Sequence, residues 1–175
     1  MTIEEVFSTI SSHMVEGIMF HDQMTNYFHF LGLHGYSKQQ SKHFEKENKN
    51  FRKVTKYYMD HYHKLIPSTR SDNPRIIPAP WFNVRMSDVD QNTRRNAVKS
   101  AFTKWIEWEK RTYDVLLKAY AELVSSEEYA AAEFINGYLT KVDYELEYAE
   151  NKLNELSMVD FDMRYILQDQ QKVEE

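Results

Sequence analysis

Residues 67–80 read PSTRSDNPRIIPAP and hold all four prolines of the 175-residue chain. Proline breaks the interior of a helix, so this stretch predicts one long connection, over residues 67–89. On both sides of it, apolar residues recur at the three- and four-residue spacing of amphipathic helices. The periodicity predicts four long helices, at about residues 3–32, 37–65, 90–124 and 127–157, followed by a C-terminal tail, 158–175, with an amphipathic segment VDFDMRYIL.

Two shorter breaks determine how these helices are joined. Gly32 and Gly35 bracket a tight turn between the first and second helices, and Ser125-Ser126 separates the third from the fourth. Ser125 with Glu128 three residues later has the pattern of a capping box, so we expect it to open the fourth helix. Two short turns and one long crossover predict a single all-α domain, a ferritin-like four-helix bundle whose third helix runs parallel to its second.

The composition excludes several classes of protein. The chain has no cysteine, which rules out disulfides, thiolate metal sites and cysteine nucleophiles. Its mean hydropathy is −0.69, no apolar run approaches the roughly 18 residues of a membrane span, and its N-terminus lacks the features of a signal peptide. No Gly-rich phosphate loop, Gly-x-Ser-x-Gly or His-Glu-x-x-His motif occurs. We therefore expect a cytoplasmic protein without membrane association that is not an enzyme.

Polar residues interrupt the apolar stripes near the middle of the expected bundle, and there are four of them: His21, Glu47, Glu109 and Glu145. An imidazole and three carboxylates at one height could bind iron, manganese or zinc. The alternative is a buried, hydrogen-bonded His–Glu pair with two partly exposed glutamates and no cofactor. Both interpretations remain open, and a residual di-metal oxidase activity is the enzymatic form of the first.

Residues 35–54, GYSKQQSKHFEKENKNFRKV, resemble the second helix of ferritins, in which a Glu-x-x-His motif supplies di-iron ligands. The matching positions are Glu47 and Asn50, so the histidine is replaced. Residues 134–153 resemble the fourth ferritin helix, but all seven histidines lie within the first 63 residues. Glu16 would match the first-helix glutamate and is expected to point away from the core. The resemblance implies a ferritin-like fold and argues against ferroxidase chemistry, because asparagine replaces imidazole poorly at iron.

Two further resemblances concern metal binding. The run YFHFLGLHGY, residues 27–36, is similar to the end of the first helix in Dps-like ferritin relatives, where His29 would match a metal-binding histidine. A histidine triad, as in DinB-like bundles, would use His13, His21 and His61.

Residues 14–36 and 43–67 resemble a family of small proteins encoded by phages and mobile elements of Gram-positive bacteria. The shared pattern covers His21-Asp22-Gln23, then Tyr27 to Gly35, then Arg52 to Tyr62. The resemblance implies a type II anti-CRISPR function. The leading hypothesis is thus a non-catalytic inhibitor that binds an RNA-guided effector nuclease and blocks DNA engagement or cleavage. The alternative is a ferritin- or Dps-like metal-binding protein with a degenerate di-metal site.

Charge is distributed unevenly along the chain. Residues 67–112 carry 9 basic and 5 acidic side chains, whereas residues 113–175 carry 5 basic and 15 acidic ones. Charged stripes are usually solvated outer faces, but they could also contact a protein or ribonucleoprotein partner, nucleic-acid phosphates without sequence specificity, or a second copy in a homodimer. The candidate partner-binding residues are Lys42, Lys46, Lys49, Lys53, Arg94, Arg95, Asp143, Tyr144, Glu147, Tyr148 and Glu150.

Overall fold

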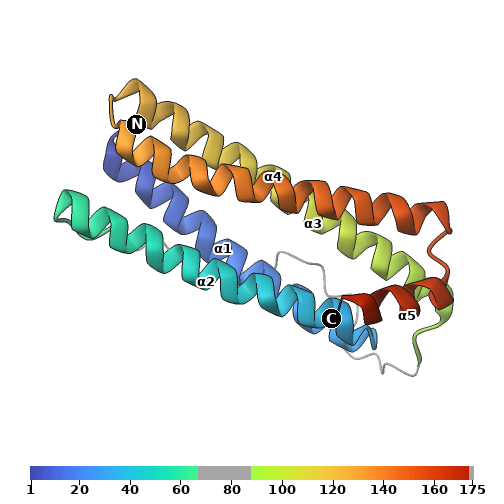
Figure 1. The fold of residues 1–175 in the computed structure, drawn as a ribbon. Coiled ribbons are helices and arrows are strands. Elements are labelled where there is room, and N and C mark those ends of the chain that lie inside the picture. Colours follow the sequence, from blue (N-terminus) through green and yellow to red (C-terminus); the bar gives the residue numbers. More distant parts are fainter. Residues whose placement is uncertain (67–87, 174–175) are drawn as a thin grey trace.

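The computed structural model describes residues 1–66 and 88–173, and Figure 1 shows how they are arranged. Most of them lie in five helices: α1 Ile3–Phe30, α2 His34–Tyr62, α3 Gln91–Ser125, α4 Tyr129–Met158 and α5 Met163–Lys172. The first four agree with the predicted helices to within three residues at each end. Most of the predicted long connection, residues 67–87, lies outside the described part of the chain.

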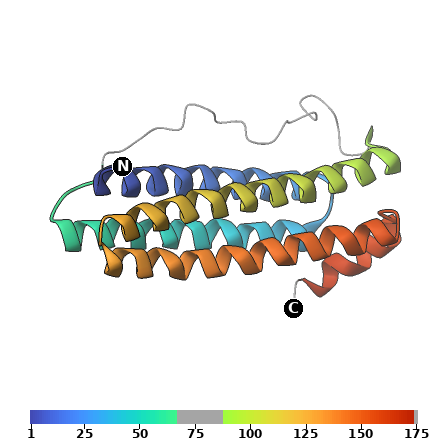
Figure 2. The same cartoon turned by 90° about the horizontal axis from the view of Figure 1, so that it is seen from above.

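The four long helices form two antiparallel pairs. α1 packs against α2 and α3 against α4 along most of their lengths (Figure 2). α2 and α3 run in the same direction (Figure 1), as the sequence predicts for a long crossover. The two pairs meet mainly along α1 and α3, while the backbones of α2 and α4 approach each other at few points. The predicted all-α four-helix bundle is confirmed, and its α2–α4 side is the more open one.

Local hydrogen bonds explain where the helices begin. At the start of α1, Thr2 and Glu5 form a capping box: the Thr2 hydroxyl accepts from the Glu5 N–H at 3.2 Å, and the Glu5 carboxylate accepts from the Thr2 N–H at 2.8 Å. Asp90 caps α3 by accepting from the Thr93 N–H at 2.7 Å. Between α1 and α2 the chain turns at Gly32, whose φ of +74° is a left-handed conformation that favours glycine.

The turn between α3 and α4 corrects one prediction. Ser125 does not open α4; it is the last residue of α3, and its hydroxyl donates to the Glu122 carbonyl at 2.9 Å. The chain reverses through Glu127, which is left-handed with a φ of 61°. The Glu128 N–H then donates to the Leu123 carbonyl at 2.9 Å. Backbone bonds to the end of α3 therefore build this turn, where the sequence pattern suggested a side-chain cap.

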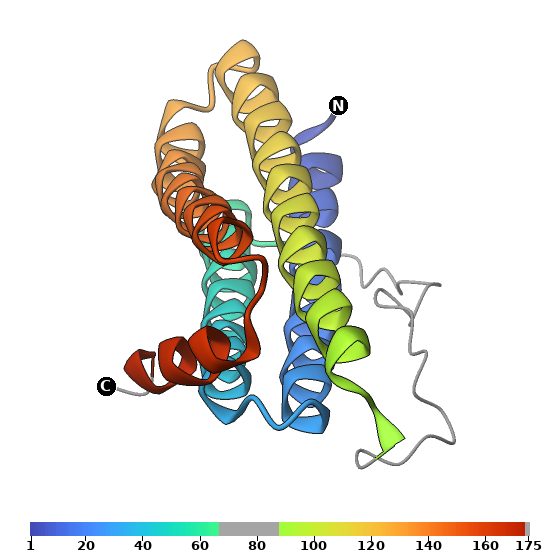
Figure 3. The same cartoon turned by 90° about the vertical axis from the view of Figure 1, so that its right-hand side faces the viewer.

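The expected C-terminal tail contains a helix, α5, that folds back across the start of α2 (Figure 3). Its Asp169 accepts from the Tyr36 hydroxyl at 2.6 Å and from the Lys152 ammonium at 3.0 Å. Gly35 lets the two helices approach closely, because a Cβ there would lie 2.0 Å from the backbone oxygen of Gln170. The C-terminal segment is thus an integral part of the bundle rather than a loose tail.

Two apolar clusters fill the interior. One lies near the α1–α2 turn and α5 and includes Phe28, Tyr36 and Phe102. The other lies near the α3–α4 turn and includes Phe7 and Leu123. None of the helices in the described residues is long and apolar enough to cross a membrane. The candidate site described next lies between the two clusters.

Candidate functional site

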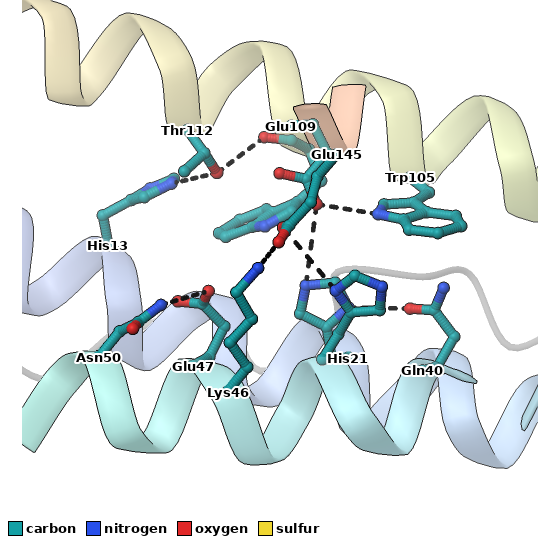
Figure 4. A network of polar contacts seen from close by, with 12 residues as sticks. His13, His21, Gln40, Lys46, Glu47, Asn50, Trp105, Glu109, Thr112 and Glu145 are labelled. Carbon is teal, nitrogen blue, oxygen red and sulfur yellow. Dashed lines mark hydrogen bonds and ion pairs between the residues drawn. The ribbon is translucent and has the colours of Figure 1, made fainter. Parts of the chain in front are cut away.

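Each of the four long helices contributes one residue to what we name the polar layer: His21 from α1, His43 from α2, Glu109 from α3 and Glu145 from α4. His21 Nε2 lies 4.0 Å from Glu109 Oε1, and His43 Nδ1 lies 3.8 Å from Glu145 Oε2. The two imidazole rings stack on each other with their centroids 5.2 Å apart. Figure 4 shows how the labelled members face one another across the bundle.

Buried hydrogen bonds orient two members of the polar layer. His21 Nδ1 lies 2.8 Å from the amide oxygen of Gln40, and both side chains are buried. Because that oxygen can only accept, Nδ1 carries the proton, and Nε2 turns its lone pair toward Glu109. On α3 the indole N–H of Trp105 donates to Glu109 Oε1 at 2.8 Å. Each of these residues is therefore held by a partner outside the layer, as metal ligands in proteins commonly are.

Burial sets the protonation states in the layer. It lowers the pKa of His21 to about 4, although the Gln40 bond acts in the opposite direction. Burial, together with the neighbouring His21 and Lys46, lowers the pKa of His43 to about 3. It raises the pKa of Glu109 to about 7, while the hydrogen bond from Trp105 works against this rise. At neutral pH both imidazoles are thus uncharged, which is the form that binds metal ions.

Lys46 brings a positive charge to the edge of the layer. Its ammonium forms an ion pair with Glu145 Oε1 (Figure 4). Burial lowers the pKa of Lys46, and the carboxylates of Glu47 and Glu109 partly restore it. The sequence predicts Lys46 on a charged outer face with Lys42, Lys49 and Lys53, whereas in the structure it points into the α2–α4 side of the bundle.

Glu47 lies beside the polar layer rather than in it. Its Oε1 accepts from the Asn50 amide at 3.4 Å, and burial raises its pKa. It lines a cavity of about 20 Å³, which has room for roughly one water molecule. Other polar groups lining this cavity come from all four long helices: His13, Lys46, Asn50, Thr112, Tyr138, Lys141 and Glu145. The sequence placed His21 level with Glu47, whereas the nearest carboxylate to His21 in the structure is Glu109.

The donor atoms of the polar layer suit a transition metal, but their spacing is wide. Metal–ligand distances of about 2.0–2.2 Å would bring two ligands of one ion to roughly 3–3.4 Å from each other. The two His–Glu separations, 4.0 and 3.8 Å, exceed this by less than about 1 Å. Within residues 1–66 and 88–173, no three His, Asp or Glu side chains stand close enough to hold one ion as they lie. Metal binding would therefore require the two His–Glu pairs to move toward one ion and Lys46 to release Glu145.

Sequence reasoning found three members of the polar layer and missed His43. The apolar residues Phe44, Phe51 and Tyr58 define the apolar stripe of α2 in the sequence and leave His43 on its flank. A signal was present: His43 follows Gln40 by three residues and precedes Glu47 by four, and such positions share one helix face.

The other candidate metal ligands do not join the layer. His29 is exposed at the α1–α2 turn, with its ring 4.9 Å from that of His34. His61 is exposed and stacks on Tyr57, so the triad of His13, His21 and His61 is not formed. Glu16 points outward to Arg111, at 2.8 Å, as the sequence predicts.

The candidate partner-binding residues lie mostly on outer faces. Lys42, Lys49 and Lys53 are exposed on α2, and Asp143, Tyr144 and Glu147 are exposed on α4. Several others have contacts within the chain. Glu150 forms an ion pair with Lys110 at 2.8 Å, and the centroid of the Tyr148 ring lies 6.0 Å from that of Trp105. Arg94 Nε donates to the Val89 carbonyl at 3.2 Å. Arg95 lines a surface hollow beside Asp160 and Phe161. Binding of a partner by these residues stays a prediction.

Comparison with known proteins bears on the fold. No protein-family model matches the sequence, and a search of curated proteins finds no match. Among solved structures, an open-pore ferritin from the hyperthermophilic archaeon Archaeoglobus fulgidus is similar, with a TM-score of 0.79 and 15% identity over 98% of this chain and 93% of that one. A humanized archaeal ferritin is similar with a TM-score of 0.75 and 14% identity over 98% of this chain and 94% of that one. The likenesses give no support to the resemblance to phage proteins; they establish that this chain has the fold of a ferritin-like four-helix bundle.

Proposed function

We propose that this chain is a ferritin-fold protein that binds one transition-metal ion, iron, manganese or zinc, through the polar layer. The observation that carries the proposal is that two uncharged imidazoles, on α1 and α2, face two carboxylates, on α3 and α4. This donor set is one that iron, manganese and zinc accept in proteins. The ligands would be His21, His43, Glu109 and Glu145.

The buried partners of these residues support a binding role. Gln40 fixes the proton of His21 on Nδ1 and leaves Nε2 free to bind. Trp105 holds one oxygen of Glu109. Because Glu109 has a pKa of about 7, it would give up its proton when it binds an ion, so binding would release protons near neutral pH. When bound, the ion would supply Lewis-acid or redox chemistry.

The same residues argue against a di-iron ferroxidase. A second ion would need donors on the far side of Glu47, where Asn50 hydrogen-bonds to that carboxylate. The remaining imidazole there, His13, stacks on Trp108 and lies 2.8 Å from the Thr112 hydroxyl. We therefore propose a single-ion centre, with the Glu47 carboxyl available to hold a proton beside the cavity.

The experiment is a count of bound metal. The purified protein is treated with a chelator, dialysed against Mn²⁺, Zn²⁺ or, under nitrogen, Fe²⁺, and analysed for metal content. We expect about one ion per chain in the wild type and loss of that ion in Glu109→Gln and His43→Ala.

One exposed glutamate and one exposed histidine outside the polar layer supply controls of the same residue types. Glu147→Gln on α4 and His34→Ala on α2 should bind as the wild type does. Absence of binding at micromolar metal in the wild type, or binding that survives both ligand substitutions, would refute the proposal. Replacement by Co²⁺ adds a second readout, because the visible absorption of the ion changes when a histidine ligand is removed.

A further inference from the structure

The ion pair between Lys46 and Glu145 lies directly beside a histidine of the polar layer, His43. Glu145 uses one carboxylate oxygen, Oε1, for the Lys46 ammonium, and its other oxygen, Oε2, lies 3.8 Å from His43 Nδ1. One carboxylate is thus shared between a fixed cation and a candidate ligand of the polar layer. We propose that the Lys46 ammonium is a built-in counter-ion, which holds Glu145 in the metal-free protein and competes with a metal ion for it. The competition rests on the proposed function, whereas the counter-ion role does not.

Charge balance within the layer supports this role. Glu109 faces His21 and Glu145 faces His43, and these uncharged imidazoles cannot neutralise a carboxylate. In the described part of the chain, Lys46 is the only lysine or arginine that forms an ion pair with either of these glutamates. The nearby Lys141, which also lines the cavity, lies over the Tyr138 ring at 5.3 Å. Without Lys46, Glu145 would therefore lose its one fixed positive partner.

The exposure of Lys46 makes the pair reversible. Its side chain is 39% exposed, while that of Glu145 is 15% exposed. A lysine has a flexible four-carbon stem, so this ammonium can rotate toward solvent through the more open α2–α4 side without unfolding a helix. The Lys152–Asp169 pair is different, because the exposed fractions there are 12% and 5% and Asp169 also accepts from Tyr36. The Lys46 ammonium can thus separate from Glu145, whereas the Lys152 ammonium stays paired with Asp169.

The consequence is that metal binding and the Lys46 contact exclude each other. A divalent ion at the polar layer would need an oxygen of Glu145 and would repel a nearby ammonium. Part of the binding free energy would then be spent on breaking the ion pair. Removal of Lys46 should lower the stability of the metal-free protein and raise its affinity for metal. Removal of a solvated surface lysine would produce neither effect.

The test compares Lys46→Met with Lys49→Met, which removes an exposed lysine three residues further along α2. Melting temperature is measured with a chelator, and the Kd for Co²⁺ is measured by optical titration. We expect Lys46→Met to melt roughly 3–8 °C lower without metal, since about 1–2 kcal/mol shifts a chain of this size by that amount. We also expect it to bind Co²⁺ at least tenfold more tightly. Lys49→Met should match the wild type in both measurements.

A double variant guards against a general loss of structure. Lys46→Met with Glu145→Gln removes both charges, so it should recover most of the lost melting temperature and show no gain in Co²⁺ affinity. Unchanged Co²⁺ affinity in Lys46→Met, or an unchanged melting temperature with chelator, would overturn the proposal.

The wild type separates this proposal from the proposed function. If the wild type binds no Co²⁺ but Lys46→Met does, the proposed function fails, and Lys46 stands as a permanent replacement for the ion. If the wild type binds Co²⁺ and Lys46→Met binds it no better, the proposed function stands and the competition is refuted. If neither protein binds Co²⁺, the proposed function and the competition are both refuted, and the melting comparison alone decides the counter-ion role.

Discussion

The indole N–H of Trp105 donates a 2.8 Å hydrogen bond to Oε1 of Glu109, one helical turn further along α3, and both side chains are buried. The fluorescent indole of Trp105 is thus hydrogen-bonded to a carboxyl group with a pKa of about 7. The ionisation of this carboxyl can therefore be followed from inside the protein.

We expect the fluorescence of the metal-free protein to change with a midpoint near pH 7. Loss of the Glu109 proton places a full negative charge beside the Trp105 indole, which alters its emission. The measurement is an emission titration between pH 5 and pH 9 with chelator present. Glu109→Gln should lack this transition; if the variant keeps it, the signal comes from another group.

The same carboxyl should make stability depend on pH. Its pKa is raised in the folded state, so between pH 4.5 and about 7 the folded chain keeps a proton that the unfolded chain has lost. Its effect is therefore a loss of stability as pH rises through this window, at most roughly 3 kcal/mol. Relative to wild type, metal-free Glu109→Gln should gain stability between pH 4.5 and pH 8, measured by urea unfolding. A constant difference between the two proteins would contradict the assignment.

The buried histidines should act in the opposite direction. Burial lowers the pKa of His13 to about 4, so the unfolded chain takes up a proton below pH 6.5 while the folded chain remains neutral. The contribution of the neutral His13 to the free energy of unfolding is then fully present above pH 6.5 and is lost as pH falls toward 4. His13→Gln should reduce proton uptake on unfolding in this window by about one proton, as read from the slope of the unfolding free energy against pH.

Gln40 is expected to control metal affinity without touching the metal. Gln40→Leu would leave His21 Nδ1 without its partner and free the ring to change its tautomer. Loss of such a supporting contact commonly weakens metal binding by about 10- to 100-fold. The Co²⁺ titration measures this, with Gln39→Leu as the control at a neighbouring position. An unchanged Kd would show that the Gln40 contact is not needed to present Nε2.

Two glycines should respond oppositely to the same substitution. Gly35→Ala would place its Cβ 2.0 Å from the Gln170 backbone oxygen, so α5 must move away. Gly137, inside α4, has no atom within 4 Å of an added Cβ. Gly137→Ala should therefore stabilise the protein by about 0.5–1 kcal/mol through helix propensity. Urea unfolding gives both values, and hydrogen exchange should show faster exchange in α5 for Gly35→Ala alone.

The fold was predictable because a few residues mark its boundaries. The prolines of residues 67–80 separate the two helix pairs, and Gly32 marks the first turn. The start of α2 was predicted three residues late, at 37 instead of His34. The reason is tertiary: Gly35 lies inside the helix and against Gln170 of α5, a contact that no local pattern reveals.

Helix periodicity predicts which residues of the site face the interior of the bundle, but not which residues of neighbouring helices they contact. His21, Glu109 and Glu145 interrupt apolar stripes, so their inward position could be read from spacing alone. The role of Lys46 could not, because it depends on the wider separation of α2 and α4. That separation lets a residue on the edge of the α2 stripe reach inward to Glu145. Spacing within one helix carries no information about the distance to the next.

The bond between Tyr36 and Asp169 joins residues 133 positions apart. Protein chains are synthesised from the N-terminus, and early segments begin to fold before later ones exist. The α1–α2 hairpin can therefore form while the surface around Gly35 and the Tyr36 hydroxyl is still bare. That surface is covered only when α5 leaves the ribosome, so during synthesis it stays exposed to chaperones and proteases until α5 has been made.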